Sequence, residues 1–171
     1  MDFSIVKLNS LSYNSTQFYS VRFADKDKTE FKDLYERMKI NSANLKEFSE
    51  IIDWMADWAD YEGALPEYFK IEKDADRLLQ PVELTNKDDG RGQDNFGLRW
   101  YCYRKNENIV ILFNGDRKTK RTAQHCENVK DYFEQAVKLS KELDKAFNSG
   151  KLYIEGEFDL KTKYGLTLKI D

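Results

Sequence analysis

The basic side chains near the middle of the chain are the residues best suited to chemistry. Between Arg99 and Arg121 the sequence carries seven basic and two acidic side chains, although the whole 171-residue chain has a formal net charge of −3. Arg117, Lys118 and Lys120 follow the apolar run IVILF and an Asn-Gly pair. Positive charge of this density can contact a phosphate group. The alternative, that these side chains simply solvate a hairpin and a helix approach, stays open.

A proton donor and two stacking rings lie near these basic residues in the sequence. His125 is the only histidine and comes four residues after Arg121, so it can supply a proton near neutral pH if the chain folds it onto the sheet. In LRWYCYR, Tyr101 and Tyr103 alternate with Arg99. A strand face of this composition suits phosphate contact combined with base stacking, so the sequence predicts RNA as the partner.

Other reaction classes lack their motifs. The chain has no nucleophile elbow, no Gly-rich phosphate loop and no paired-cysteine or His-x-x-x-His metal pattern. Asp53, Asp57 and Asp60 recur at helical spacing and are close enough to share a cation, but a solvated acidic helix face is the alternative. Cys102 and Cys126 follow no framework spacing. We therefore expect neither a metal nor a cofactor.

Hydrophobic periodicity and turn residues predict the order of elements. Short strands are followed by two amphipathic helices, a loop, a hairpin and a long helix. The expected ranges are strands at 3–8 and 18–23, helices at 25–39 and 44–59, an exposed loop at about 73–95, strands at 97–104 and 109–113, a helix from 127 to about 148, and closing strands at 152–158 and 164–170. The first helix is expected to start from Asp27 and Glu30.

The two central strands should form a hairpin through the four-residue loop KNEN. Alternation sends Leu98, Trp100 and Cys102 to one face of the first strand and Arg99 to the other, whereas IVILF is apolar on both faces. Because the hairpin brings the two strands side by side, we expect Arg99, Arg117 and Arg121 to converge on one surface patch.

Composition predicts one folded domain that spans residues 1–171. Aromatic residues make up 14% and charged residues 35% of the chain, with two prolines and eight glycines. The fold class is α+β: a small mixed or antiparallel sheet, two helices before the core strands, one helix after them and a C-terminal β-hairpin extension at 151–171. No apolar run approaches the roughly 20 residues of a membrane span, and MDFSIVKLNS lacks the features of a secretory signal. We expect a cytoplasmic protein with no membrane association.

The order of these elements resembles the RelE/ParE superfamily of bacterial toxins, particularly its HigB-like members. The resemblance covers about residues 17–148 and is most specific from Gly97 to Thr122, where LRWYCYR, a hairpin and IVILFNGDRKTKRT precede a helix. In that family the last core strand typically ends in a Lys/Arg-rich exit with Thr.

The resemblance implies an mRNA interferase, which cuts messenger RNA on the ribosome by attack of the ribose 2′-hydroxyl on the neighbouring phosphate, without a metal. Its partners would be a cognate antitoxin and mRNA on the ribosome. The implied catalytic residues are Arg99, Arg117, Lys118, Arg121 and His125. The implied RNA-binding residues are Lys70, Tyr101, Tyr103, Arg104 and Lys120. The alternative is a non-catalytic interaction protein, such as a phage or mobile-element factor, that uses the basic patch to bind protein or nucleic acid.

Overall fold

The computed structural model describes residues 1–81, 97–119, 126–165 and 167–170, apart from the side chain of residue 164. The helices and strands of the described residues are β1 (Asp2–Ser12), β2 (Gln17–Phe23), α1 (Glu30–Met38), α2 (Ser42–Tyr61), η1 (Pro66–Tyr68), β3 (Phe69–Glu72), β4 (Ala75–Leu78), β5 (Leu98–Asn106), β6 (Ile109–Arg117), α4 (Glu127–Asn148), β7 (Leu152–Glu155), β8 (Asp159–Thr162), η2 (Lys163–Gly165) and β9 (Leu168–Lys169). These elements confirm the predicted α+β class.

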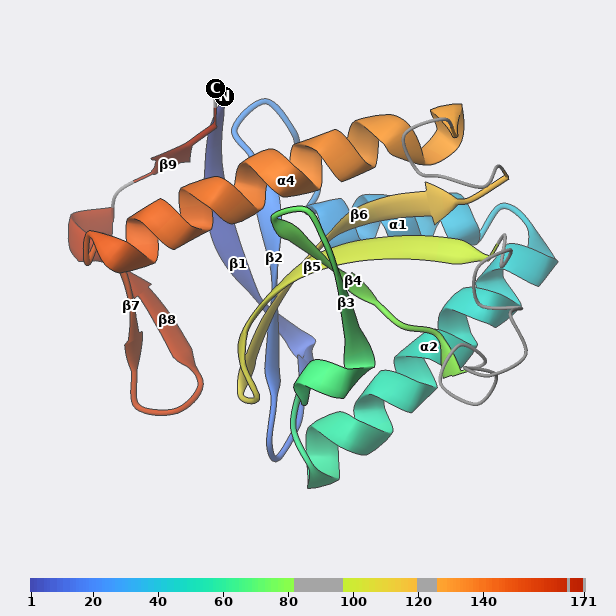
Figure 1. Ribbon diagram of the computed structural model, residues 1–171, viewed down its shortest axis with the longest axis horizontal. Coiled ribbons are helices and arrows are strands. Elements are labelled where there is room, and N and C mark those ends of the chain that lie inside the picture. The colour runs from blue at the N-terminus through green and yellow to red at the C-terminus, as the bar shows by residue number, and fades with distance from the viewer. Residues whose placement is uncertain (82–96, 120–125, 166, 171) are drawn as a thin grey trace.

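One mixed sheet of seven strands organises the molecule, in the order β3-β4-β5-β6-β2-β1-β9. Its neighbours pair antiparallel except β2 and β6, which run parallel. The long helix α4 crosses one face of the sheet, whereas α1 and α2 cover the other (Figure 1). We call these the α4 face and the α2 face. None of the described helices combines the length and apolar character that crossing a bilayer requires.

The alternation predicted for β5 is confirmed and divides the core in two. Leu98, Trp100 and Cys102 belong to the cluster of buried residues on the α2 face. Tyr101 and Tyr103 belong to the cluster on the α4 face, together with Phe133 and Leu139 of α4. The run IVILF in β6 contributes to both clusters, as expected for a central strand covered on each side.

The β5–β6 pair contains a bulge that no sequence pattern signalled. Cys102 pairs with Leu112 and Trp100 pairs with Gly115. The two pairs are therefore two positions apart in β5 but three positions apart in β6. Gly115 passes so close to β5 that a Cβ there would lie 1.9 Å from the carbonyl oxygen of Arg99. The extra residue inverts the alternation of β6 beyond the bulge, because side chains in a strand alternate with a period of two.

The starts of α1 and α2 are capped by short polar side chains. Thr29 caps α1 by accepting a hydrogen bond from the Lys32 amide, so the predicted start at Asp27 was two residues early. Asn41 caps α2 and accepts from the amides of Ala43 and Asn44.

Three predicted details of the connections are wrong. The β5–β6 turn spans two residues rather than four, because Lys105 and Asn106 still belong to β5. The start of the predicted loop at 73–95 instead contains β4, and 82–96 lies outside the described residues. The C-terminal hairpin is present but joins β7 to β8, whereas β9 pairs with β1 and brings the two ends of the chain side by side (Figure 1).

Candidate functional site

Four basic side chains gather on the α4 face, near the point where β5 begins and β6 ends. Arg77 lies directly opposite Tyr101 of β5, and Lys70 lies directly opposite Arg77. Residues directly opposite one another in an antiparallel pair share a face. Arg99 is two residues from Tyr101 and shares its face as well. Lys118 follows the bulged end of β6. We call Lys70, Arg77, Arg99 and Lys118 the cationic cluster.

Most of this positive charge is buried. Arg77 is 2% exposed, Arg99 3% and Lys118 8%, whereas Lys70 is exposed. Glu72 lies with them, and its Oε1 is 2.8 Å from Nε of Arg77. Buried cations are costly to desolvate, so a fold keeps them where an opposite charge or an anionic ligand compensates.

The pKa of Lys118 is lowered from its ordinary value. Burial lowers this pKa most, and the nearby charge of Arg99 lowers it further. Glu72 acts in the opposite direction, and Arg77 and Lys70 add to the lowering. A lysine in such surroundings gives up its proton more readily than a solvated one and is therefore better matched to proton transfer near neutral pH.

A buried hydroxyl group faces the same cluster. The Tyr101 side chain is fully buried, and its hydroxyl has no hydrogen-bond partner among the described residues. Burial raises the pKa of Tyr101, with opposing effects of Glu72 on one side and Arg77 and Arg99 on the other. The hydroxyl is therefore neutral, and it is a donor that an anion in the cluster would satisfy.

The start of α4 lies beside the end of β6. The Thr119 amide donates to Sγ of the buried Cys126, the N-cap residue of α4, at 3.2 Å. This contact places the segment that carries Lys118 next to the N-terminus of a 22-residue helix. The positive end of a helix dipole favours anions, so it adds to the potential of the cluster.

The predicted convergence of Arg99 and Arg117 is wrong. Arg117 lies directly opposite Leu98, on the α2 face. Its Nε donates to Oδ1 of Asn44 at 2.9 Å, and its Nη2 pairs with Oε2 of Glu47, both on α2. The bulge in β6 is the cause, since regular alternation would place Arg117 on the α4 face and Lys118 on the α2 face.

The placement of Tyr101, Tyr103 and Arg104 also does not support the RNA-binding roles predicted for them. Tyr101 packs against Phe133, and Tyr103 stacks on Phe147, so α4 covers both rings and neither can stack on a base. Arg104 lies at the far end of β5 from Arg99, where its Nε donates to the carbonyl of Ala64 at 2.5 Å. Lys120, Arg121 and His125 lie outside the described residues.

The cluster thus combines three predicted residues with one that sequence reasoning missed. Lys70, Arg99 and Lys118 were predicted, whereas Arg77 was assigned to a loop. A sequence signal for Arg77 does exist, because Ala75 and Arg77 are two residues apart and therefore share one face of β4. This signal is weak in a strand of only four residues.

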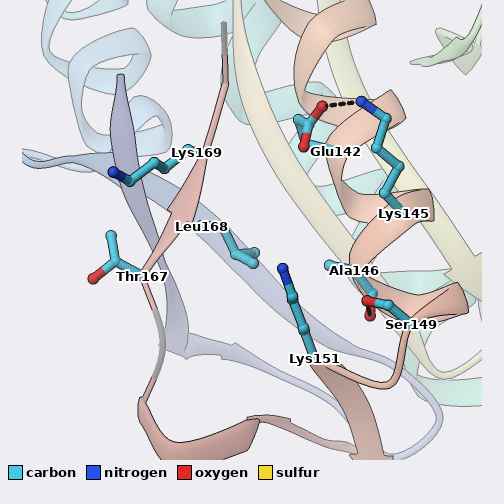
Figure 2. A pocket seen from close by; sticks show the side chains of 8 residues that line it. All are labelled: Glu142, Lys145, Ala146, Ser149, Lys151, Thr167, Leu168 and Lys169. Carbon is cyan, nitrogen blue, oxygen red and sulfur yellow. Dashed lines mark hydrogen bonds and ion pairs between the residues drawn. The ribbon is translucent and has the colours of Figure 1, made fainter.

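A second basic pocket of about 430 Å³ lies between the end of α4, β7 and β9 (Figure 2). Lys145 bonds to Glu142 at 2.5 Å, and Lys169 extends away from Lys145 and Lys151 toward Asp2 at 3.7 Å. Its cations therefore do not converge on one point, and we do not treat it as the functional site.

The acidic side chains of α2 have separate surroundings. Asp60 accepts a hydrogen bond from the Asn14 amide at 3.1 Å, whereas Asp57 lines a pocket with Trp58. Within the described ranges, no group of three or more His, Cys, Asp or Glu side chains is arranged to hold a metal ion.

Comparisons of the chain with protein-family models, with curated proteins and with solved structures gave no match.

Proposed function

We propose that this protein is a metal-independent endoribonuclease of the RelE/HigB-like toxin type, and that the cationic cluster binds the RNA phosphate at which cleavage occurs. The observation that carries the proposal is the burial of Arg77, Arg99 and Lys118 near one another, with Arg77 and Arg99 near the Tyr101 hydroxyl, which has no hydrogen-bond partner among the described residues. The N-terminus of α4 beside Lys118 adds to this support.

The proposed reaction needs the groups that the cluster offers. The ribose 2′-oxygen attacks phosphorus and loses its proton, while the bond to the 5′-oxygen breaks and that oxygen gains a proton. The products are a 2′,3′-cyclic phosphate and a 5′-hydroxyl. Arg77 and Arg99 would stabilise the charge that develops on the phosphate oxygens. Lys118, with its lowered pKa, would transfer a proton.

The partners follow from the same proposal. The substrate is mRNA on the ribosome, and a cognate antitoxin with an acidic or amphipathic segment would cover the basic face. Charge complementarity of this kind favours rapid association and suppresses other partners.

The test is inducible expression in bacteria, with growth and the ends of a reporter mRNA as readouts. We expect growth arrest and new mRNA ends that carry 2′,3′-cyclic phosphates. Arg99→Ala should reduce cleavage about 10²- to 10³-fold, as typically follows the loss of one preorganised electrostatic donor. Arg117→Ala is the matched control, because it removes the same group from the opposite face of the sheet.

Cleavage that survives the combined loss of Arg99 and Lys118, in protein that circular dichroism shows to be folded, would contradict the nuclease proposal. RNA binding that falls with these substitutions, without any cleavage by the parent chain, would instead support the non-catalytic alternative. Such binding should weaken steeply with added salt, because neutralised phosphates release counterions.

A further inference from the structure

Another pocket lies at the end of α2. It has a volume of about 230 Å³ and is lined by Trp54, Asp57, Trp58, Tyr61, Glu62 and Tyr68. We call it the aromatic pocket. Its volume is below the roughly 300 to 1,000 Å³ of pockets that hold drug-sized ligands, so it suits a single long side chain.

Three aromatic rings that line the pocket pack against one another. Tyr68 stacks on Trp58 with centroids 5.3 Å apart, and Trp54 stands edge-on to both. The Tyr68 hydroxyl donates to Glu62, and this hydrogen bond raises the pKa of Tyr68 to about 12. Tyr61 is 84% exposed at the rim. Aromatic faces attract cations through the ring quadrupole, most strongly when the cation is partly desolvated.

The electrostatic surroundings point to a cation as well. From Asp53 to Glu67 the chain carries five acidic residues and no basic one. Asp57 and Glu62 belong to the pocket itself. A guanidinium group combines a flat surface for ring stacking with donors for carboxylates, so arginine matches this lining better than lysine does.

Two neighbouring features indicate that the cation belongs to a peptide. β3 follows Tyr68 directly and is the last strand of the sheet, so its outer edge has no strand neighbour among the described residues. Ile71 on this edge strand is 75% exposed. An extended peptide can pair with such an edge.

We propose that the aromatic pocket and the edge of β3 form a docking site for an extended, arginine-bearing segment of a protein partner, with the guanidinium group in the pocket. The aromatic pocket shares no residue with the cationic cluster, whereas β3 also carries Lys70 of that cluster.

The test follows the indole N–H signals of Trp54 and Trp58 by NMR during titration of the full chain. The probe is a ten-residue peptide with blocked ends that contains one central arginine among valines and threonines. The comparison probes are the same peptide with neutral citrulline in place of arginine, and arginine amide alone. We expect the arginine peptide to shift both signals and to bind about five- to thirty-fold more tightly than the citrulline peptide.

Asp57→Asn combined with Glu62→Gln should weaken binding of the arginine peptide by a similar factor. Asp53→Asn, the same change one turn earlier on α2 and outside the aromatic pocket, should leave binding within about two-fold. Equal binding of the two peptides, or no shift at millimolar peptide, overturns the proposal. Arginine amide that binds as tightly as the peptide overturns it too, because the site would then take a free small cation.

Discussion

The basic side chains on the α2 face and those on the α4 face have different surroundings. On the former, Arg117 is held by Glu47 and Asn44, and Arg37 lies 3.0 Å from Asp33 and 3.3 Å from Asp116. On the latter, Lys70, Arg77, Arg99 and Lys118 lie with Glu72.

The basic side chain of Arg37 belongs to a polar network between α1 and β6. Arg37 also donates to the carbonyl of Gly115 at 2.8 Å, and Asn114 donates to Glu30 and Asp33 at 2.9 and 2.8 Å. Polar groups in such a network satisfy one another and fix α1 against β6. On the α4 face, burial lowers the pKa of Lys118 most, and the nearby charge of Arg99 lowers it further.

The largest effect is expected from a substitution that disrupts the bulge in β6, because the bulge places Arg117 on the α2 face and Lys118 on the α4 face. Gly115→Ala would place a Cβ 1.9 Å from the Arg99 carbonyl oxygen, so β5 and β6 would have to separate. We expect a loss of about 4 kcal/mol or more in the free energy of unfolding, measured by urea denaturation. Gly156→Ala is the control, because φ there is +69° and the new Cβ would meet no atom within 4 Å. It should cost only about 1 to 2 kcal/mol. Equal losses would mean that the bulge is not held by this contact.

A core substitution should disrupt the α2 face without affecting the chemistry assigned to the α4 face. Trp100 stacks on Phe48 with centroids 5.0 Å apart, and its Nε1 donates to the Phe113 carbonyl at 3.1 Å. Trp100→Ala should lower the free energy of unfolding by about 3 to 5 kcal/mol, because it leaves a large cavity. Cleavage per folded molecule, measured below the unfolding transition, should stay unchanged. A change in cleavage at constant folded fraction would show that the two faces are coupled.

Removing the Arg117 side chain should have a smaller effect that is confined to stability. Its partner Glu47 is partly exposed and also accepts from the Leu98 amide at 2.8 Å. Arg117→Ala should therefore cost about 1 kcal/mol in urea denaturation, near the upper end for exposed ion pairs. RNA cleavage should remain within about two-fold of the parent chain. A loss of cleavage as large as that of Arg99→Ala would show that Arg117 takes part in catalysis.

The smallest expected effect is a pH dependence that follows from the burial of Lys118 and from the charge of its basic neighbours. Because the pKa of Lys118 is lowered on folding, the folded chain releases this proton before the unfolded chain does. Stability of the parent chain should rise with pH between the folded-state pKa and the ordinary value of 10.5. Lys118→Met should thus be more stable than the parent at neutral pH, and its advantage should shrink as the pH approaches 10. A difference in unfolding free energy that does not vary with pH would contradict the shift.

Local patterns in the sequence determined much of this protein. The alternation of LRWYCYR and the doubly apolar IVILF predicted β5 and β6 with their faces, and the spacing of Val129, Phe133 and Leu139 predicted α4. These predictions succeeded because a side chain's direction within one element follows from its position in that element alone. Arg99 and Lys118 were singled out from local charge and strand patterns, whereas Lys70 was named from the resemblance to the RelE/ParE superfamily.

Only the tertiary structure decided which basic residues meet. One extra residue in β6, accommodated by Gly115 against Arg99, exchanged Arg117 for Lys118 on the α4 face. Pairing between β3, β4 and β5 added Arg77, and α4 covered the tyrosine rings that looked suited to stacking. Bulges, pairing partners and the helix that covers a face depend on contacts between segments far apart in the chain, and no local periodicity encodes such contacts.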